Sequence, residues 1–327
     1  MKTTYPGTRN YILKTKDHKL NENFRNLKKI NSLQYRIVGN LADGVSYYKY
    51  LSFENAIRSL QAGTIALVEP TRWNDAYECL YYEADYSAVS SDYATHPKVY
   101  ATCMTHKKYD EPAWRIYSGN GNVCIQFEMD RPRLRFELLK ALEKEDVIYE
   151  GMVKYPPRHV IDNLYKKMLI TKAGVEIDNT AYMNCIINSS SPFEQGKFIH
   201  LLMLKRPDFK HEEETRLFVI KKSDIDSKTP KALEKSIEQT DAAGRMTLSV
   251  KGDLLLLNVN WINILKCVTI NQAESSLYYI NLRNTINEMI DNNSNLTATD
   301  KNDLKIRLKP ISYLVYGKTP TQIKIEA

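Results

Sequence analysis

The sequence has few of the features that mark membrane, secreted or disulfide-rich proteins. Its longest apolar run, residues 254–259, has the length of a strand, whereas a membrane-spanning helix needs roughly 18 apolar residues. The basic amino-terminal residues are not followed by an apolar stretch, which argues against a secretory signal. The five cysteines are scattered, odd in number and free of CxxC pairs, so neither a disulfide framework nor a cysteine-based zinc site is expected. We therefore expect a cytoplasmic protein with no membrane contact.

The common catalytic fingerprints are also missing. The sequence GNG at 119–121 lacks the Lys-Ser/Thr pair of a phosphate-binding loop and does not match a dinucleotide fingerprint. There is no GxSxG nucleophile elbow and no HExxH zinc motif, and the six histidines are dispersed. No metal site is expected, so function has to be inferred from less specific patterns.

The composition is that of an ordinary globular protein, with 43% hydrophobic and 26% charged residues over 327 positions. The net charge of +7 is unevenly distributed, because residues 9–29 contain seven basic and two acidic side chains. Such a stretch can contact nucleic acid or an acidic partner, although a solvated extension is the commoner outcome.

The chain organisation predicts an extension followed by one domain. Residues 1–44 are polar, and weak apolar spacing predicts a short helix there; residues 45–327 are expected to form a single α+β domain. Strands and helices alternate without a regular βαβ rhythm, which favours a mixed, mostly antiparallel sheet with flanking helices. A helix is expected in ENAIRSLQA, ending at Gly63. Strands are expected in VSYYKYLSF, TIALV, VYATCMTH, VCIQFEM, EETRLFVI and, last, DLKIRLKPISY.

Charged residues inside these strand-like segments are the first candidates for a site. Lys49 lies between Tyr48 and Tyr50 in a segment otherwise suited to burial, where a charge is costly unless it is paired or functional. Asp75 and Glu78 in WNDAYE have a spacing of three, which places both carboxylates on one face of a helix. An equally open interpretation makes Asp75 an N-cap.

The segment HEEETRLFVI supplies the remaining charges. If it is extended, Glu212, Glu214 and Arg216 point to one side. Two carboxylates and a guanidinium on one face can bind a sugar hydroxyl, stabilise a cationic transition state or hold a metal. A structural ladder of ion pairs along a sheet edge explains the same spacing equally well. Trp114 and Tyr117, one helical turn apart, offer a surface for stacking on a base or nicotinamide ring, although core packing is the commoner role.

Taken in order, seven segments between residues 45 and 280 resemble the domain of unknown function family 2971 (DUF2971). They are YYKY, LQAG, PTRWNDAYE, ATCMT, EPAWRIYSGNGNVCIQFE, VKY and KRPDFKHEEETRLF. The family combines a Tyr-Lys-Tyr strand, a Phe-Asn-Asp-Pro-Phe-Glu motif, a Cys-Phe-Ser strand, a Trp-x-x-Tyr helix and a late Glu-x-Glu-x-Arg segment. The resemblance implies that the family's motif residues fall on Lys49, Asn74, Asp75, Glu78, Trp114, Tyr117, Glu212, Glu214 and Arg216.

The chain departs from the family pattern at several positions. Trp73, Ala76 and Tyr77 replace Phe, Pro and Phe, and Phe209 replaces Trp. Residues 102–105, Thr-Cys-Met-Thr, stand where Cys-Phe-Ser is expected, so no role is carried over to that strand. The family's activity is not established, and its members look like bacterial accessory or defence-island proteins.

The order of the motifs also resembles, more distantly, an ADP-ribosyltransferase layout. This implies an NAD-using enzyme, a toxin or antiphage defence effector, with NAD as substrate, a nucleic acid or protein as acceptor, and a defence-system protein as partner. Glu214 would stabilise the ribosyl cation, Lys49 and Arg216 would meet the pyrophosphate, and Trp114 or Tyr117 would stack on nicotinamide. The implied catalytic residues are Glu214, Glu212 and Lys49, and the implied substrate-binding residues are Tyr48, Tyr50, Asn74, Asp75, Glu78, Trp114, Tyr117 and Arg216.

Two alternatives stay open. The charged residues can form a buried network in a non-catalytic protein that binds a ligand or a partner. The acidic members can instead surround Mg²⁺ in a metal-dependent nuclease, which would suit the basic residues 9–29.

Overall fold

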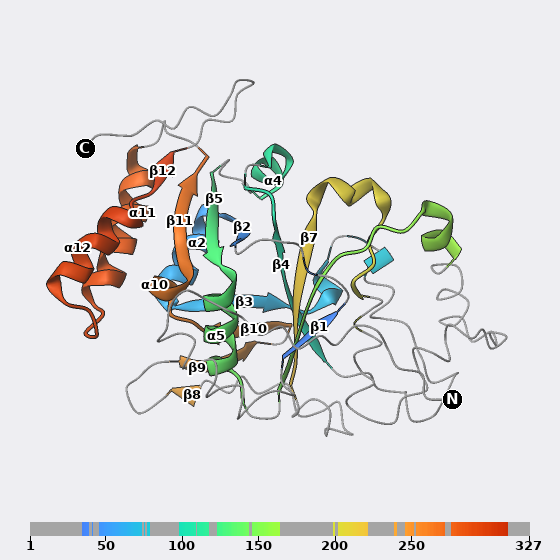
Figure 1. Ribbon diagram of the computed structural model, residues 1–327, viewed down its shortest axis with the longest axis horizontal. Helices are drawn as coiled ribbons and strands as arrows, with labels where there is room; N and C mark the ends of the chain where they lie inside the picture. Colours follow the sequence, from blue (N-terminus) through green and yellow to red (C-terminus); the bar gives the residue numbers. More distant parts are fainter. Residues whose placement is uncertain are drawn as a thin grey trace. The chain divides into compact units, whose positions relative to one another are not determined.

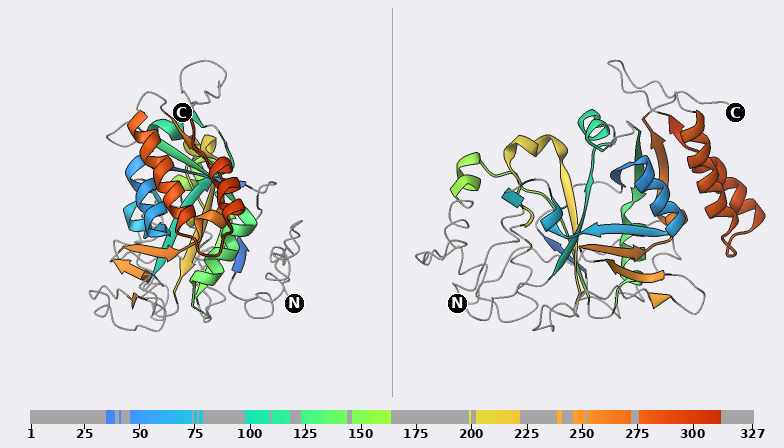
Figure 2. Two further views of the ribbon diagram at one scale, coloured as in Figure 1. Left: turned by 90° about the vertical axis from the view of Figure 1, so that its left-hand side faces the viewer. Right: turned by 180° about the vertical axis from the view of Figure 1, so that it is seen from behind.

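A computed structural model gives the fold of the chain (Figures 1 and 2). It describes residues 35–38, 41, 46–73, 75, 77–78, 98–108, 110–117, 123–143, 146–163, 199, 202–221, 239–240, 246–251, 253–271 and 276–312. Among these residues, no helix is both long and apolar enough to cross a membrane.

The chain divides into two compact units, each built from separate stretches of sequence. Unit 1 comprises Met1–Ala42, Leu67–Cys103 and Leu142–Leu256, and unit 2 comprises Asp43–Ala66, Met104–Ala141 and Leu257–Ala327. The borders fall within strands β3 (Thr64–Val68), β4 (Val99–Thr105) and β10 (Leu254–Asn258). The single domain expected over residues 45–327 stays a prediction.

Unit 2 contains a sheet in the order β12-β11-β5-β2, with helices packed around it. Its elements are β2 (Ser46–Ser52), α2 (Phe53–Ala62), α4 (Glu111–Ile116), β5 (Cys124–Asp130), α5 (Arg131–Ala141), α10 (Trp261–Ile264), β11 (Leu265–Ile270), α11 (Ser276–Asp291), α12 (Ala298–Arg307) and β12 (Ile311–Ser312). Strand β5 is antiparallel to both β2 and β11, and β12 runs parallel to β11. Helix α11 packs against α2 and α12 (Figure 2).

Helix α2 begins and ends where its sequence predicts. The side chain of Ser52 caps its first turn, and Gly63 closes it in the left-handed conformation at φ 61°. Glycine is favoured there because a side chain at positive φ is strained. The ring of Phe53 meets that of Tyr278 on α11 edge to face, with 4.7 Å between their centroids, and this contact fixes α2 against α11.

The last predicted strand, DLKIRLKPISY, is wrong for most of its length. Residues up to Arg307 belong to helix α12, and only Ile311–Ser312 form a strand. Helix α12 starts with a capping box, in which Thr297 and Asp300 satisfy each other's backbone N–H groups. These reciprocal bonds stabilise the first turn of a helix.

Unit 1 contains the strands that carry the candidate site. Its elements include β1 (Tyr35–Val38), η1 (Pro70–Arg72), β6 (Val147–Met152), η4 (Pro207–Glu212), β7 (Glu214–Ile220), β8 (Gln239–Thr240) and β9 (Met246–Lys251). Strand β6 pairs with β1 in parallel and with β7 in antiparallel register, and β7 also pairs with β4. Every residue of β7 is buried.

The pairing of β1 with β6 depends on a glycine. Gly151 lies opposite Val38, and a Cβ atom at position 151 would collide with the carbonyl oxygen of Val38. Strand β1 lies inside the stretch 1–44 that we expected to be an extension, so at least residues 35–38 are part of the sheet. The helix predicted in that stretch lies outside the described residues.

The predicted fold class is confirmed. The chain is α+β, and its sheet is mixed and mostly antiparallel: β1–β6 and β11–β12 are parallel, whereas β2–β4, β2–β5, β3–β4, β5–β11, β6–β7 and β8–β9 are antiparallel.

Candidate functional site

The candidate site lies at the start of strand β7 in unit 1. The strand predicted in EETRLFVI begins one residue later than expected, and Glu212 does not have the extended conformation that would place it on one side with Glu214 and Arg216. Pro207 opens the 3-10 helix η4, which ends at Glu212, and Glu213 then adopts φ 43° before β7 begins at Glu214. The fixed φ of proline suits the first position of a helix, so the local sequence favours this turn. Only Glu214 and Arg216 keep the two-residue spacing of a strand face.

Arg216 is at the centre of the site, and each nitrogen of its guanidinium donates at least one hydrogen bond. Its side chain is 1% exposed. Nε and Nη2 donate to the two carboxylate oxygens of Glu214 at 2.7 and 3.1 Å, a bidentate pair. Nη1 donates to the carbonyl oxygen of Leu202 at 2.5 Å, and Nη2 also donates to Oε2 of Glu78. The ring of Trp73 covers the guanidinium, with its centroid 4.3 Å from Cζ.

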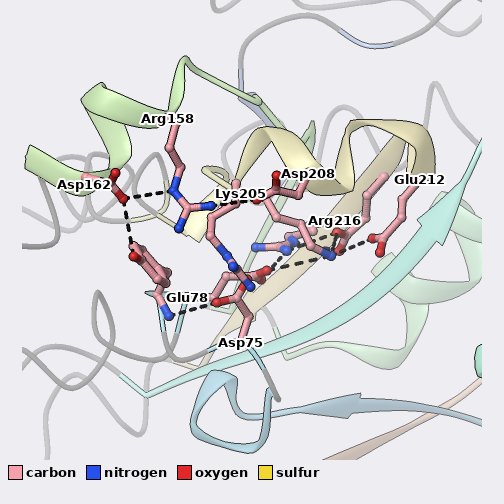
Figure 3. Close-up of polar contacts among 11 residues, drawn as sticks. Asp75, Glu78, Arg158, Asp162, Lys205, Asp208, Glu212 and Arg216 are labelled. Carbon is pink, nitrogen blue, oxygen red and sulfur yellow. Dashed lines mark hydrogen bonds and ion pairs between the residues drawn. The ribbon is translucent and has the colours of Figure 1, made fainter.

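Lys205 joins the carboxylates from another side (Figure 3). Its Nζ lies 2.6 Å from Oε2 of Glu212, 3.0 Å from Oε2 of Glu214 and 3.7 Å from Oε1 of Glu78. The same ammonium group lies 4.8 Å from the ring centroid of Phe209. Three carboxylates therefore share two cations in a partly closed environment.

The pKa values of the two most buried carboxylates of the site, Glu78 and Glu214, are shifted in opposite directions. Burial alone would raise the pKa of Glu214, but the charges of Arg216 and Lys205, with a hydrogen bond from Cys103, hold it at about 2. The pKa of Glu78 is raised by burial, and its attraction to Arg216 and Lys205 is too weak to offset this burial and the repulsion from Glu214. Glu214 is therefore ionised, whereas Glu78 holds a proton more readily than an ordinary glutamate.

Tyr155 fixes the backbone at the start of the strand. Its hydroxyl oxygen accepts a hydrogen bond from the N–H of Glu214 at 3.0 Å. Burial raises the pKa of Tyr155, so its hydroxyl stays protonated. Together with the positive φ of Glu213, this bond determines where the Glu214 side chain emerges.

A second layer of charges surrounds Tyr77. Oδ2 of Asp75 pairs with Nε of Arg206 at 3.1 Å, and its Oδ1 accepts the backbone N–H of Tyr77 at 2.9 Å. Asp75 thus makes the turn-type contact expected of a cap and an ion pair at the same time. The guanidinium carbons of Arg206 and Arg158 lie 5.1 and 5.6 Å from the Tyr77 ring centroid, and the Tyr77 hydroxyl donates to Asp162 at 3.3 Å.

The predicted aromatic residues lie in unit 2, where they form a cluster, and Lys49 lies in the same unit. Trp114 is 1% exposed and meets Tyr50 edge to face at 5.0 Å, which favours the core interpretation for Trp114. Tyr117 is 46% exposed and stacks on Tyr50 at 6.4 Å. Tyr48 packs against the same cluster. Lys49 lies opposite Phe127 in the β2–β5 pairing.

The structure thus brings Asp75, Glu78, Glu212, Glu214 and Arg216 together within unit 1. Asn74 lies outside the described residues. The NAD contacts assigned to Lys49, Trp114 and Tyr117 stay predictions from the sequence.

The sequence reasoning missed several contributors, among them Trp73, Lys205 and Arg206. Lys205 and Arg206 lie in the segment KRPDFKHEEETRLF, which carries the family resemblance, so their position in this segment could have identified them as site residues. Trp73 was noted only as a replacement for Phe. The more distant ADP-ribosyltransferase resemblance had assigned Arg216 to a pyrophosphate, but its guanidinium is enclosed by Glu214, Glu78, Leu202 and Trp73.

The arrangement suits chemistry in which positive charge develops on a ligand. An ionised carboxylate in a low-dielectric environment stabilises a cation more strongly than one in water. In the part of the chain that the structure describes, no group of three or more His, Cys, Asp or Glu side chains is arranged to hold a metal ion. The acidic residues here are instead bound to Lys205, Arg206 and Arg216.

Comparison with known proteins gives one relationship. No curated protein and no solved structure matches the chain. Residues 113–217 match the model of a family described as protein of unknown function (DUF2971), a range that includes Trp114, Tyr117, Glu212, Glu214 and Arg216. This match confirms the DUF2971 relationship predicted from the sequence.

Proposed function

We propose that the protein is an NAD-using, ADP-ribosyltransferase-like enzyme in which Glu214 is the catalytic carboxylate. In this reaction the bond between the ribose C1′ and the nicotinamide nitrogen breaks, and its electron pair leaves with nicotinamide. Positive charge develops on the ribosyl ring in the transition state. Glu214 stabilises that charge, and an acceptor nucleophile then forms the new bond to C1′.

The observation that carries the proposal is a buried carboxylate that is kept ionised. Glu214 is 5% exposed, yet Arg216 and Lys205 hold its pKa at about 2. A fixed, ionised group of this kind interacts more strongly with a transition state that carries charge than with a neutral ground-state group. Arg216 acts as a positioning residue, because its bidentate pair fixes the orientation of the Glu214 carboxylate.

Glu212 complements Glu214 at the more open side of the site. Its side chain is 23% exposed, and it shares Lys205 with Glu214. In the proposal its carboxylate accepts a hydrogen bond from a ribose hydroxyl, which places C1′ next to Glu214. Hydrogen bonds of this kind, which strengthen as the ring becomes cationic, contribute to glycosyl transfer.

The test is release of nicotinamide from NAD by the purified protein, with nucleic-acid and protein acceptors present. We expect turnover by the wild type and a loss on the order of 10²–10³-fold in Glu214→Gln, the loss typical of removing one transition-state stabilising group. Glu143→Gln is the matched control, because Glu143 is an exposed carboxylate of the same unit. The proposal is wrong if neither the wild type nor Glu214→Gln releases nicotinamide with any acceptor. A toxin or antiphage role predicts that expression of the wild type, but not of Glu214→Gln, arrests growth.

A second candidate function is a non-catalytic ligand-binding protein. The observation in its favour is that both oxygens of Glu214 and all three guanidinium nitrogens of Arg216 are already engaged. Networks that are fully satisfied rigidify a fold and need have no other role. This candidate predicts that Glu214→Gln lowers the melting temperature while the wild type shows no NAD turnover. Turnover by the wild type that depends on Glu214 would exclude it.

A further inference from the structure

Glu78 has one carboxylate oxygen, Oε1, that accepts no hydrogen bond from another described residue. Its side chain is 5% exposed, and its backbone N–H donates to the carbonyl oxygen of Asp75 at 3.0 Å. Oε2 accepts from Nη2 of Arg216. Oε1 lies 3.7 Å from Nζ of Lys205, which is longer than a hydrogen bond. Among the described residues, no donor lies within hydrogen-bond distance of Oε1, so this oxygen can accept from a group of the ligand.

Glu78 is less stabilised as an anion than Glu214. Arg216 and Lys205 attract it, and Glu214 and Asp75 repel it. Arg216 gives Glu214 a bidentate pair but gives Glu78 a single nitrogen, Nη2, which Glu214 also uses. Burial raises the pKa of Glu78, and this weaker pairing does not offset it, whereas the charges of Arg216 and Lys205 outweigh burial at Glu214 and lower its pKa. Two neighbouring carboxylates whose pKa values are shifted in opposite directions are typical of sites where one carboxyl group transfers a proton and the other stays ionised.

We propose that Glu78 is the proton acceptor of this site and that the acceptor substrate is a hydroxyl or neutral amine seated against Oε1. This rests on the proposed function and adds a catalytic role for Glu78. The nucleophile's lone pair forms the new bond to C1′ as the C1′–nicotinamide bond breaks. The electron pair of the broken bond leaves with neutral nicotinamide, and the proton of the nucleophile moves to Oε1. Release of that proton to water restores the site.

Neither of the other two carboxylates suits this role. Both oxygens of Glu214 accept from Arg216, and one also from Lys205, so a proton there would neutralise the charge on which all three contacts depend. Glu212 is bound to Lys205 at 2.6 Å, the shortest of the three Lys205 contacts. Lys205 thus holds Glu212 and Glu214 close and Glu78 at a distance.

The experiment combines kinetics with direct titration of the carboxyl group. NAD cleavage is measured against pH for the wild type, Glu78→Gln, Glu78→Asp and the exposed control Glu143→Gln. Removing a general base is expected to lower kcat by about 10²-fold or more, and Glu78→Asp should recover part of it. The wild-type rate should fall at low pH as Glu78 becomes protonated, and Glu78→Gln should lack that limb. In parallel, carbon-13 NMR identifies the Glu78 carboxyl signal by its absence from Glu78→Gln.

The outcomes separate this inference from the proposed function. A Glu78 signal that titrates at or below 4.5, its ordinary value, overturns the inference whatever the NAD assay gives. Folded Glu78→Gln with the wild-type kcat and pH profile also overturns it, while leaving the role of Glu214 intact. A wild type without NAD turnover overturns the proposed function, whereas a raised titration of Glu78 then still supports a proton acceptor for another ligand. If Glu78→Gln does not fold, Glu78→Asp supplies both the kinetic comparison and the shifted NMR signal.

Discussion

Replacing Glu214 by glutamine should destabilise the fold in a way that depends strongly on pH. The folded-state pKa of Glu214 is about 2, against an ordinary value of 4.5. A lowered pKa contributes stability that is fully present above the unfolded value and is lost as the pH falls through the folded value. The difference of about 2.5 units corresponds to on the order of 3 kcal/mol at pH 7, and to less than half of that at pH 3.

The assay is urea denaturation of the wild type and Glu214→Gln between pH 3 and pH 7. The two unfolding free energies should differ by on the order of 3 kcal/mol at neutral pH and approach each other in acid, with unchanged slopes in urea. Glu288→Gln, at an exposed carboxylate of helix α11, should match the wild type at both ends of the range. A Glu214→Gln variant as stable as the wild type at pH 7, or a difference that is constant with pH, would refute the electrostatic account.

Two further perturbations test other buried charges. Lys205→Met removes the ammonium group shared by three carboxylates, and it should lower the free energy of unfolding in urea by about 3–5 kcal/mol at pH 7 and by less in acid. The control is Lys305→Met, because Lys305 pairs with the half-exposed Asp291. A Lys205→Met variant as stable as the wild type would contradict the expectation. Glu150 is 0% exposed, and burial raises its pKa to about 8 even though a hydrogen bond from Tyr35 lowers it. The free energy of unfolding of the wild type should therefore fall as the pH rises from 4.5 through 8. Glu150→Gln should remove this loss, on the order of 3 kcal/mol at pH 7, and parallel pH profiles of the two proteins would contradict it.

Part of the fold follows directly from local sequence patterns. Helix α2 could be predicted because its apolar spacing ends at a glycine that takes positive φ. The pairing of Glu214 with Arg216 could be predicted because strand geometry places residues two apart on one face. Helix α12 was misassigned because Leu304, Ile306 and Leu308 alternate with charged residues as in a strand. Its capping box at residues 297–300 lies just before that segment and was the deciding signal.

The rest of the site depends on tertiary contacts that no local pattern contains. The distance between Lys205 and Glu78 is set by how their segments pack, not by their spacing of 127 positions. Trp73 covers Arg216 from a segment remote in sequence. The pKa values of Glu78 and Glu214 shift in opposite directions because of burial and because of which carboxylate oxygen faces which nitrogen. Both are properties of the folded chain.

The saturation of Arg216 has a consequence for how unit 1 assembles. Its partners come from residues 78, 202 and 214, and Glu78 is 138 positions away along the chain. A chain in which any one of these segments has not yet docked leaves an unmatched charge in an apolar interior, and such states are strongly disfavoured. Partially folded forms of unit 1 should therefore be scarce at equilibrium. The site and the native packing around it therefore form together. A substitution that disrupts the packing should also disrupt the site, and a substitution in the site should also destabilise the packing.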